Sequence, residues 1–527
     1  MKLCLLLSVA LLPVSARPAS ASTNGGHILR VARLFDPLTL DVPKMGLVED
    51  VLLIPLLNQS LLDVRDGTNL VPGAARAWST SPDWRVYTFQ LRPGVRFSNG
   101  REVVAGDYVY ALERLLNPAT AAGMSSYFQG VRGARQFAAG LTNHVAGLSA
   151  PTPDTLVIEL AKPDPTFGFL LLTQGVAVPA EEVARLGPGF SIQPVGTGPY
   201  LVEEWKRGVR LRLTRNPYYH GVEPQHLDGV EILIGGDEAT HLMMFERGEL
   251  DIANITLAGI PLPSLRRLQK DPRWRYLIEN EELFQTDFIT LNTEVPPLDN
   301  VLVRRAINHA INRDKWERVA TGYATHAEGI LPRIMPGFNP GLRGYDFNPD
   351  KARQLLRESG LPLPLHSVLW HGLDEPSRYL AQGVQADLKR VGMELDLKPV
   401  TFAQLFSSME IRKKVPMGFS GWFAAIPDGV DMLGQQFDGR TVTNAFTWNQ
   451  AFYQNPEVDR LLDEAAPEID LRRRYETYQR AERLIVQEAP VAILGHQNKY
   501  ALRQRRLKGP LMDPFWIYRF DRVWIED

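Results

Sequence analysis

The fold of this chain is decided at residues 196–219, which open with Gly196-Thr197-Gly198-Pro199-Tyr200 and close with Arg215-Asn216-Pro217-Tyr218-Tyr219. Two glycines that can adopt positive φ, followed by a proline with a fixed φ, predict a turn at the first site. Apolar residues at 209, 211 and 213 then alternate with polar ones, which predicts a strand with one buried face. The opening run lacks the Lys-Ser/Thr ending of a phosphate-binding loop, so we interpret it as structural.

Length and composition predict a globular protein of several subdomains. The chain has 527 residues, which is more than one hydrophobic core usually supports, so two or three subdomains are expected. Hydrophobic residues make up 44% and charged residues 22% of the chain, as in ordinary globular proteins. The net charge is −2, or −4 without residues 1–21. This balance gives no basic surface for nucleic acid or anionic lipid.

Residues 1–21 have the pattern of a secretory signal peptide. Lys2 precedes a short apolar run at residues 3–12, and Ala19-Ser20-Ala21 provides a small-residue cleavage site. No later stretch approaches the ~20 apolar residues that a membrane helix needs. We therefore expect cleavage after about Ala21 and export to the periplasm, with a retained N-terminal anchor as the alternative. The single cysteine, Cys4, would be removed, which leaves no disulfide and no Cys-based metal site.

Residues 77–118 contain the most specific sequence pattern. Apolar residues at 87, 89 and 91 alternate with polar ones and predict a strand, and Pro93-Gly94 and Asn99-Gly100 predict turns. Apolar residues at 108, 111, 112 and 115 then predict an amphipathic helix, with Asp107 as its cap and Asn117-Pro118 as its stop. Asp299 or Asn300 can cap a helix that follows, and Asn348 can cap another, with Pro349 as its first residue. From residue 348 onward, helix and strand patterns alternate, which is typical of α/β layers.

In this order, these segments resemble the extracytoplasmic solute-binding proteins of family 5, the dipeptide- and oligopeptide-binding proteins of ABC transporters. Further similar segments are the turn at residues 248–252 and the strand, turn and helix at residues 288–311. The resemblance covers residues 25–527. It implies an α/β, bilobal, periplasmic-binding-protein-like fold of the class II type, with an additional small inserted domain.

The resemblance also implies domain boundaries and a function. The first lobe would be assembled from residues 22–62, 191–287 and 488–527, the inserted domain would hold residues 63–190, and the second lobe residues 288–487. Such a protein traps a peptide or peptide-like solute between its lobes and delivers it to the permease subunits of an ABC importer in the inner membrane. A monomer without cofactor and without enzymatic activity is expected.

Enzyme signatures are absent from the sequence. There is no His-Glu-x-x-His, no Gly-x-Ser-x-Gly and no phosphate-binding loop. The closest histidine pairs, at 220/226 and 366/371, lack the spacing of metal ligands on one helix face, so no metal site is predicted. Because sequence does not place two carboxylates across a bond, an exported hydrolase with an unrecognised carboxylate pair stays open. A ligand-sensing subunit on the same fold is the other alternative.

An apolar-aromatic stretch at residues 419–423 supplies the main ligand-contact candidates. Such a strand is usually core, but a Gly-Trp pair at a strand end is also how a backbone edge is offered to an extended ligand. In the family this stretch pairs with bound peptide and the Trp lines a side-chain pocket, which implies ligand contacts for Gly421, Trp422 and Phe423. Phe402 and Met124 stand where the family has other pocket side chains.

Two departures from the family pattern concern the ends of a bound peptide. Peptide binders of this family place an Asp three residues after the Trp, to hold the α-ammonium, whereas this chain has Ala425. Asp428 would replace that Asp only if its loop turns inward. Dipeptide binders use an Arg where this chain has His371, and a neutral His cannot match the bidentate guanidinium. Because Ala425 offers no counter-charge to the α-ammonium, weak or no binding of free dipeptides is expected.

Overall fold

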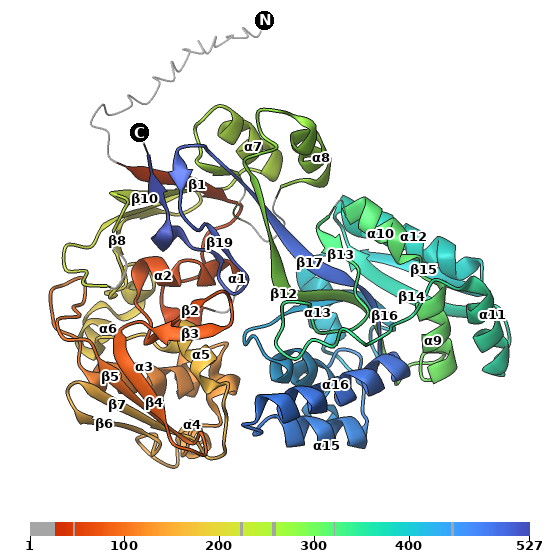
Figure 1. Cartoon of the computed structure of the whole chain (residues 1–527), viewed down its shortest axis with the longest axis horizontal. Helices are drawn as coiled ribbons and strands as arrows, with labels where there is room; N and C mark the ends of the chain where they lie inside the picture. Colours follow the sequence, from red (N-terminus) through yellow and green to blue (C-terminus); the bar gives the residue numbers. More distant parts are fainter. Residues whose placement is uncertain are drawn as a thin grey trace, which may run out of the picture.

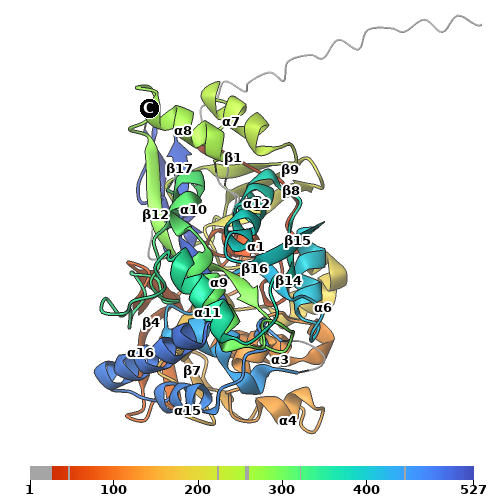
Figure 2. The same ribbon diagram turned by 90° about the vertical axis from the view of Figure 1, so that its right-hand side faces the viewer.

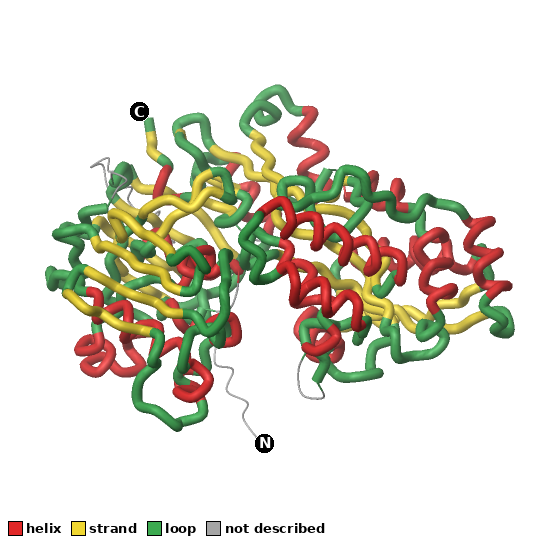
Figure 3. Tube along the Cα trace, turned by 60° about the horizontal axis from the view of Figure 1, so that its bottom comes forward, coloured by secondary structure: helices red, strands yellow, loops and turns green. Residues whose placement is uncertain are grey.

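A computed structural model describes residues 27–526 except 46–47, 222–224, 254, 256–259, 321 and 444–446. The predicted signal peptide and Cys4 lie outside the described residues. The chain forms two bodies joined by two long strands, β12 (Ile278–Leu291) and β17 (Val491–Arg503) (Figure 1). We call them the first lobe, which holds both chain ends of the described part, and the second lobe. Figure 3 shows that each body combines sheet strands with helices packed on them.

The first lobe is built on a four-stranded sheet in the order β1-β10-β9-β8. Its strands are β1 (Ile28–Arg33), β8 (Tyr200–Lys206), β9 (Arg210–Arg215) and β10 (Gly229–Ile234). β1 runs parallel to β10, so the start of the described chain joins the middle of the sequence. The strand predicted between the two turns is confirmed as β9, whose Leu211 and Leu213 are buried.

The two glycines of the opening turn serve close packing rather than positive φ. Neither Gly196 nor Gly198 has a positive φ. A Cβ on Gly196 would lie 2.1 Å from the Leu57 carbonyl oxygen, and one on Gly198 would lie 2.4 Å from the Asn58 nitrogen. The turn therefore requires glycine because it presses against the end of α2 (Ile54–Leu57), a long-range contact that no local pattern reveals.

A second four-stranded sheet, in the order β4-β5-β7-β6, lies beside the first within the same lobe (Figure 1). Its strands are β4 (Ala75–Thr80), β5 (Val86–Leu91), β6 (Leu148–Thr152) and β7 (Thr155–Glu159), and it is entered through the hairpin of β2 (Leu62–Arg65) and β3 (Asn69–Pro72). The helix predicted after the second turn is α3 (Ala105–Leu116). Asp107 is not the N-cap of this helix, as predicted, but its third residue. The Asp107 carboxylate accepts the Val104 N–H at 2.9 Å.

The remaining elements of the first lobe are short. The helices are α1 (Val48–Val51), α2, α4 (Ala134–Ala138), α5 (Phe167–Gln174), α6 (Ala180–Leu186), α7 (Glu238–Glu246) and α8 (Leu262–Lys270). The C-terminal segment adds the pairs β18 (Leu507–Lys508) with β21 (Trp524–Ile525), and β19 (Met512–Asp513) with β20 (Ile517–Tyr518).

The largest sheet links the two lobes. Its strand order is β11-β17-β12-β16-β14-β15, and β13 (Ala324–Thr325) pairs with β17. The other strands are β11 (Ile252–Ala253), β14 (Leu365–Gly372), β15 (Met393–Val400) and β16 (Met417–Phe423). β12 and β17 run side by side from one lobe into the other (Figure 2). Their pairing shifts register between Glu282 and Phe288, and such bulges bend and twist a ladder.

Helices cover the sheet of the second lobe. They are α9 (Val301–Ala310), α10 (Arg313–Ala320), α11 (Pro349–Glu358), α12 (Glu375–Lys389), α13 (Phe402–Met409), α14 (Gln435–Phe437), α15 (Pro456–Ala465) and α16 (Leu471–Glu488). The predicted caps at Asn300 and Asn348 are confirmed, because each side chain accepts a backbone N–H of its helix. The alternation of helix and strand predicted beyond residue 348 is also confirmed.

The two lobes touch through apolar side chains. One hydrophobic cluster contains Tyr87 and Phe89 of β5 together with Tyr478 and Ile485 of α16. Burial of this shared surface contributes roughly 25 cal/mol per Å² of apolar area removed from water. The structure therefore shows the lobes in contact.

A buried carboxylate supports the loop behind the crossing strands. Glu482 of α16 accepts the Ile330 and Leu331 N–H groups at 2.7 and 2.9 Å, and its second oxygen is buried without a hydrogen-bond partner among the described residues. The Thr286 hydroxyl of β12 donates to the Ile330 carbonyl at 2.7 Å. Glu482 thus fixes a loop that is bonded to the strand between the lobes.

Glu482→Gln is expected to remove a pH dependence of stability. Burial raises the pKa of the Glu482 carboxyl from 4.5 to about 7, against two opposing backbone hydrogen bonds. A raised folded-state pKa stabilises the fold below the unfolded-state pKa, and this contribution is lost as the pH rises from 4.5 to about 7. The variant should therefore gain more in melting temperature over the wild type at pH 8 than at pH 5. Glu464→Gln, at an exposed position of α15, is the control, and an equal gain at both pH values would contradict the prediction.

Candidate functional site

β16 offers a free backbone edge. Ala424 N–H donates to the Phe284 carbonyl at 2.8 Å, and Asn292 N–H donates to the Pro416 carbonyl at 2.9 Å. Because bonding alternates along an antiparallel pair, the even-numbered residues of β16 bond β12 and the odd-numbered ones face away. β14 occupies that opposite edge only as far as Gly418. Among the described strands, none pairs with the edge at Gly421 and Phe423.

Any side chain at Gly421 would displace the Asp287 carboxylate. A Cβ would lie 2.4 Å from the Asp287 Oδ1 on the neighbouring strand. The Asp287 carboxylate accepts the Gln285 side-chain amide at 2.9 Å and that of Gln497, and its burial raises the pKa to about 6. The Gly-Trp pair singled out from sequence therefore stands beside a buried carboxylate.

Trp422 is half-buried next to Gly421. Its Nε1 donates to Asp431 Oδ2 at 3.3 Å, and its ring meets that of Trp448 edge-on at 5.3 Å. Such edge-to-face pairs are worth about 0.5–1.5 kcal/mol beyond their buried area. Trp422 is thus held in one orientation by a carboxylate and by a second aromatic ring.

The sequence did not single out Asp431, which lies in a one-turn π-helical segment at Val430–Gly434. Its Oδ2 accepts the Ala425 N–H at 2.6 Å, so a carboxylate stands next to the position where we expected none. Its Oδ1 accepts the Tyr127 hydroxyl of the first lobe at 3.0 Å. Burial raises the pKa of Asp431 to about 6, and no Lys, Arg or His of the described chain forms an ion pair with it.

Asp431 and Tyr127 both line a groove between the two lobes. The groove has a volume of about 860 Å³, within the usual range for ligand sites. One wall comes from the first lobe, between Ser126 and Leu170, and the other from the second lobe, between Ile426 and Pro467. Arg135 and Lys162 lie on its first-lobe wall and are exposed. The Tyr127–Asp431 hydrogen bond crosses the groove.

Asp428 is engaged inside the second lobe. Its carboxylate pairs with Arg474 at 2.9 and 3.1 Å, and only 7% of the Asp428 side chain and 1% of the Arg474 side chain are exposed. Arg474 also donates to the carbonyls of Ala465, Ala466 and Glu468. Asp428 does not line the groove described above.

The other predicted contacts are more dispersed. His371 is buried at the end of β14, where its Nδ1 lies 2.7 Å from the Gly372 carbonyl oxygen. Phe402 begins α13 and is 72% exposed, with its ring 4.4 Å from that of Phe406. Met124 lies in the loop before Tyr127 and packs half-buried on the core that the lobes share. The structure therefore joins Gly421, Trp422 and Phe423 on one strand and leaves His371, Phe402 and Met124 on other elements.

Sequence reasoning missed Asp431, Tyr127 and Trp448. Asp431 follows Trp422 by nine residues through a turn, which matches no strand or helix period. Tyr127 belongs to a different lobe, and no pattern in the chain connects it to Asp431. Only the Pro-Asp turn after Trp422 indicated this region, and its aspartate is Asp428.

The described residues show neither a metal centre nor a membrane span. No cluster of three or more His, Cys, Asp or Glu side chains within them is arranged to hold a metal ion. None of the described helices combines the length and the apolar character that crossing a bilayer requires.

Two lobes, two crossing strands and a groove between the lobes define a bilobal α/β solute receptor. The family model for bacterial extracellular solute-binding proteins, family 5, matches residues 69–444. The chain belongs to this family, as the resemblance predicted. It is a solute-binding protein of the kind that serves ABC importers, and the family is described as bacterial and extracellular.

Individual relatives are similar over nearly the whole chain. The dipeptide-binding protein of Escherichia coli K12 is 25% identical over 508 residues, which is 91% of either chain. The probable di/tripeptide-binding protein 5 of Pseudomonas aeruginosa is 28% identical and covers 97% of both. The solved structure of clavulanic acid biosynthesis oligopeptide binding protein 2 superposes with a TM-score of 0.87 at 24% identity, covering 95% of this chain and 96% of that one. This likeness confirms the predicted fold class.

Proposed function

We propose that this protein binds a peptide or peptide-like solute between its lobes and delivers it to the permease subunits of an ABC importer. The free edge of β16 at Gly421 carries the proposal, because an extended peptide backbone can add to such an edge as a further strand. Main-chain hydrogen bonds then supply affinity that does not depend on the peptide sequence. Two relatives named for dipeptide and di/tripeptide binding support the same substrate class.

Asp431 is the group that we assign to the peptide's α-ammonium. Its Oδ1 accepts one hydrogen bond, from Tyr127, and therefore keeps a second acceptor site. A buried carboxylate without a cationic partner is costly, and an ammonium would neutralise it. The expectation of weak dipeptide binding rested on Ala425 alone, and Asp431 removes that reason. Trp422, Phe423, Phe402, Met124 and His371 remain our candidates for side-chain contacts, and Asp428 acts behind them through Arg474.

The two lobes would close by a hinge motion at the strands that cross between them. We keep the lobe boundaries predicted from sequence, with residues 63–190 as the inserted domain and the hinge in β12 and β17. A ligand that touches β16 and the first-lobe wall together favours the closed state, because only that state offers both contacts. The hydrogen bond between Tyr127 and Asp431 is one such inter-lobe contact.

The proposed compartment is the periplasm, and the proposed assembly state is a monomer. The signal-like residues 1–21 would be cleaved after about Ala21, and the mature protein would act in the periplasm as a monomer, without cofactor and without catalysis. Its macromolecular partner would be the inner-membrane permease.

The deciding experiment is mass spectrometry of what co-purifies, followed by calorimetric titration with di-, tri- and tetra-alanine. We expect an unaltered peptide in the preparation and binding of at least one alanine peptide. Turnover of peptides or glycans during incubation would favour the alternative of an exported hydrolase. Absence of both a co-purifying peptide and alanine-peptide binding would contradict the proposed substrate class.

Trp422→Ala is expected to weaken binding of tri-alanine more than tenfold while the protein stays folded. The substitution removes a ring beside the free edge and leaves a half-buried gap that water can fill. Calorimetry gives the affinity and thermal melting checks the fold. Tyr276→Ala, which changes a 73% exposed aromatic residue of the first lobe, is the control. Unchanged affinity of the Trp422 variant would show that this ring is only part of the packing.

A further inference from the structure

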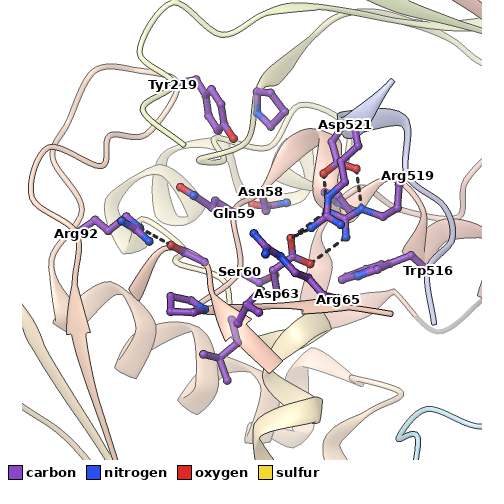
Figure 4. A pocket seen from close by; sticks show the side chains of 17 residues that line it. Asn58, Gln59, Ser60, Asp63, Arg65, Arg92, Tyr219, Trp516, Arg519 and Asp521 are labelled. Atoms are coloured by element: carbon purple, nitrogen blue, oxygen red, sulfur yellow. Dashed lines mark hydrogen bonds and ion pairs between the residues drawn. The ribbon is translucent and has the colours of Figure 1, made fainter. Parts of the chain in front are cut away.

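A second cavity lies within the first lobe and shares no residue with the groove between the lobes. Its volume is about 340 Å³. Five segments meet around it: residues 55–73, Arg92, the turn at Pro199, the turn at Tyr219, and the C-terminal residues 516–522. Figure 4 shows Arg92 on one side, Arg65, Trp516 and Arg519 on the other, and Gln59 and Ser60 between them. We call it the arginine pocket.

Two of its four arginines are neutralised by two aspartates. Arg519 donates to both oxygens of Asp63 at 3.0 Å and to those of Asp521 at 2.9 and 2.7 Å. Arg522 donates to Asp63 at 2.6 Å. Burial would raise the pKa of Asp63, but Arg519 and Arg522 outweigh it and hold the pKa below its usual value. These four groups carry no net charge.

The other two arginines leave the pocket with two surplus positive charges. Arg92 uses its Nε for the Gly73 carbonyl at 2.8 Å, which leaves both terminal nitrogens for a ligand. The Arg65 side chain is exposed and forms no hydrogen bond or ion pair with any described residue. Among the residues that line the pocket, no carboxylate remains to balance these two guanidinium groups.

The pocket also contains buried donors that lack acceptors. The Nε of Arg522 and the Nε1 of Trp516 are buried and have no hydrogen-bond partner among the described residues. The side chains of both residues line the pocket. Buried polar atoms in native proteins are nearly always satisfied, so these two unpaired donors are an unusual feature of the pocket lining.

We propose that the arginine pocket binds a small anion through a carboxylate or phosphoryl group, separately from the solute held between the lobes. Guanidinium groups are the side chains best suited to these groups, because their paired N–H donors match two oxygens at once. The turns at Pro199 and Tyr219, which close the first-lobe sheet, thereby form part of a wall of a binding site. The Asp63–Arg519 pair joins β2 to the C-terminal segment in another part of the lining.

The test is calorimetric titration of the full chain with inorganic phosphate and, separately, with succinate. We expect one binding site for at least one probe, and the probe that binds tells a phosphoryl from a carboxylate ligand. In an Arg65→Ala/Arg92→Ala variant, affinity for that probe should fall at least thirtyfold. Affinity for tri-alanine should not change, because neither arginine lines the groove.

Two further variants keep the result interpretable. Arg65→Gln alters only an exposed side chain, so folding is preserved, and it should weaken the probe at least threefold. Arg132→Ala removes a cation that lies in the other cavity and pairs with Glu159, so it should leave probe binding unchanged. Binding of neither probe by the wild type, or equal binding by the wild type and the double variant, would overturn the proposal.

Discussion

Arg474→Ala is expected to lower the free energy of unfolding by about 3–5 kcal/mol, the largest stability effect that we expect from a single substitution here. Arg474 is nearly fully buried and pairs with Asp428 through two hydrogen bonds. Alanine would leave the Asp428 carboxylate buried without a cation. It would also free three carbonyl oxygens that Arg474 now satisfies.

Urea unfolding followed by far-UV circular dichroism measures this loss. The matched control is Arg460→Ala on α15, where an exposed arginine pairs with Glu457 and Glu464. Exposed ion pairs typically contribute about 0–1 kcal/mol to the free energy of unfolding. If Arg474→Ala fails to fold, Asp428→Asn/Arg474→Met tests the same point, because removing both charges should restore a folded protein. A loss below about 1 kcal/mol for Arg474→Ala would contradict a structural role for the pair.

Asp431→Asn is expected to weaken binding of tri-alanine at least thirtyfold, which corresponds to about 2 kcal/mol or more. The amide has nearly the same shape but carries no charge, so a bound α-ammonium would lose its buried counter-charge. The loss of tri-alanine affinity in Asp431→Asn should exceed the loss in Tyr127→Phe. The latter variant removes one hydrogen bond to the same carboxylate and keeps the charge.

N-acetyl-tri-alanine provides the second ligand of a double-mutant cycle. Four affinities are measured, for the wild type and Asp431→Asn with the free and with the acetylated peptide. Acetylation removes the ammonium, so the wild type should bind the acetylated peptide far more weakly than the free one. The Asp431→Asn variant should hardly distinguish the two, because the charge that reads the ammonium is gone. Equal discrimination by wild type and variant would show that another group holds the amino terminus, or that the terminus is not read.

Sequence patterns predicted the local elements well because their causes are local. The strand at Leu211 and Leu213, the helix stop at Asn117 and the caps at Asn300 and Asn348 follow from periodicity and from hydrogen bonds within a few residues. Asp107 differed because its carboxylate reaches back to Val104 from inside the helix. The predictions were right about which of these segments are helical or extended, and wrong about the position of Asp107 in its helix.

The candidate site was predictable only along one strand. Gly421, Trp422 and Phe423 are consecutive, so their shared position on β16 needed no long-range information. Asp428 was the natural carboxylate for a ligand in the sequence, but Arg474, 46 residues further on, engages it. Tyr127 is 304 residues from Asp431, and that separation hides their hydrogen bond from any local pattern.

The sequence by itself determined the family, the two-lobed α/β fold and the strand that carries the Gly-Trp pair. The tertiary structure alone decided which carboxylate stands beside Ala425, why Gly196 must be glycine, and where four arginines meet in the first lobe. The physical reason is range. Hydrophobic periodicity and capping act within a few residues, whereas a charge finds its partner, and a backbone its close neighbour, only after distant segments have packed.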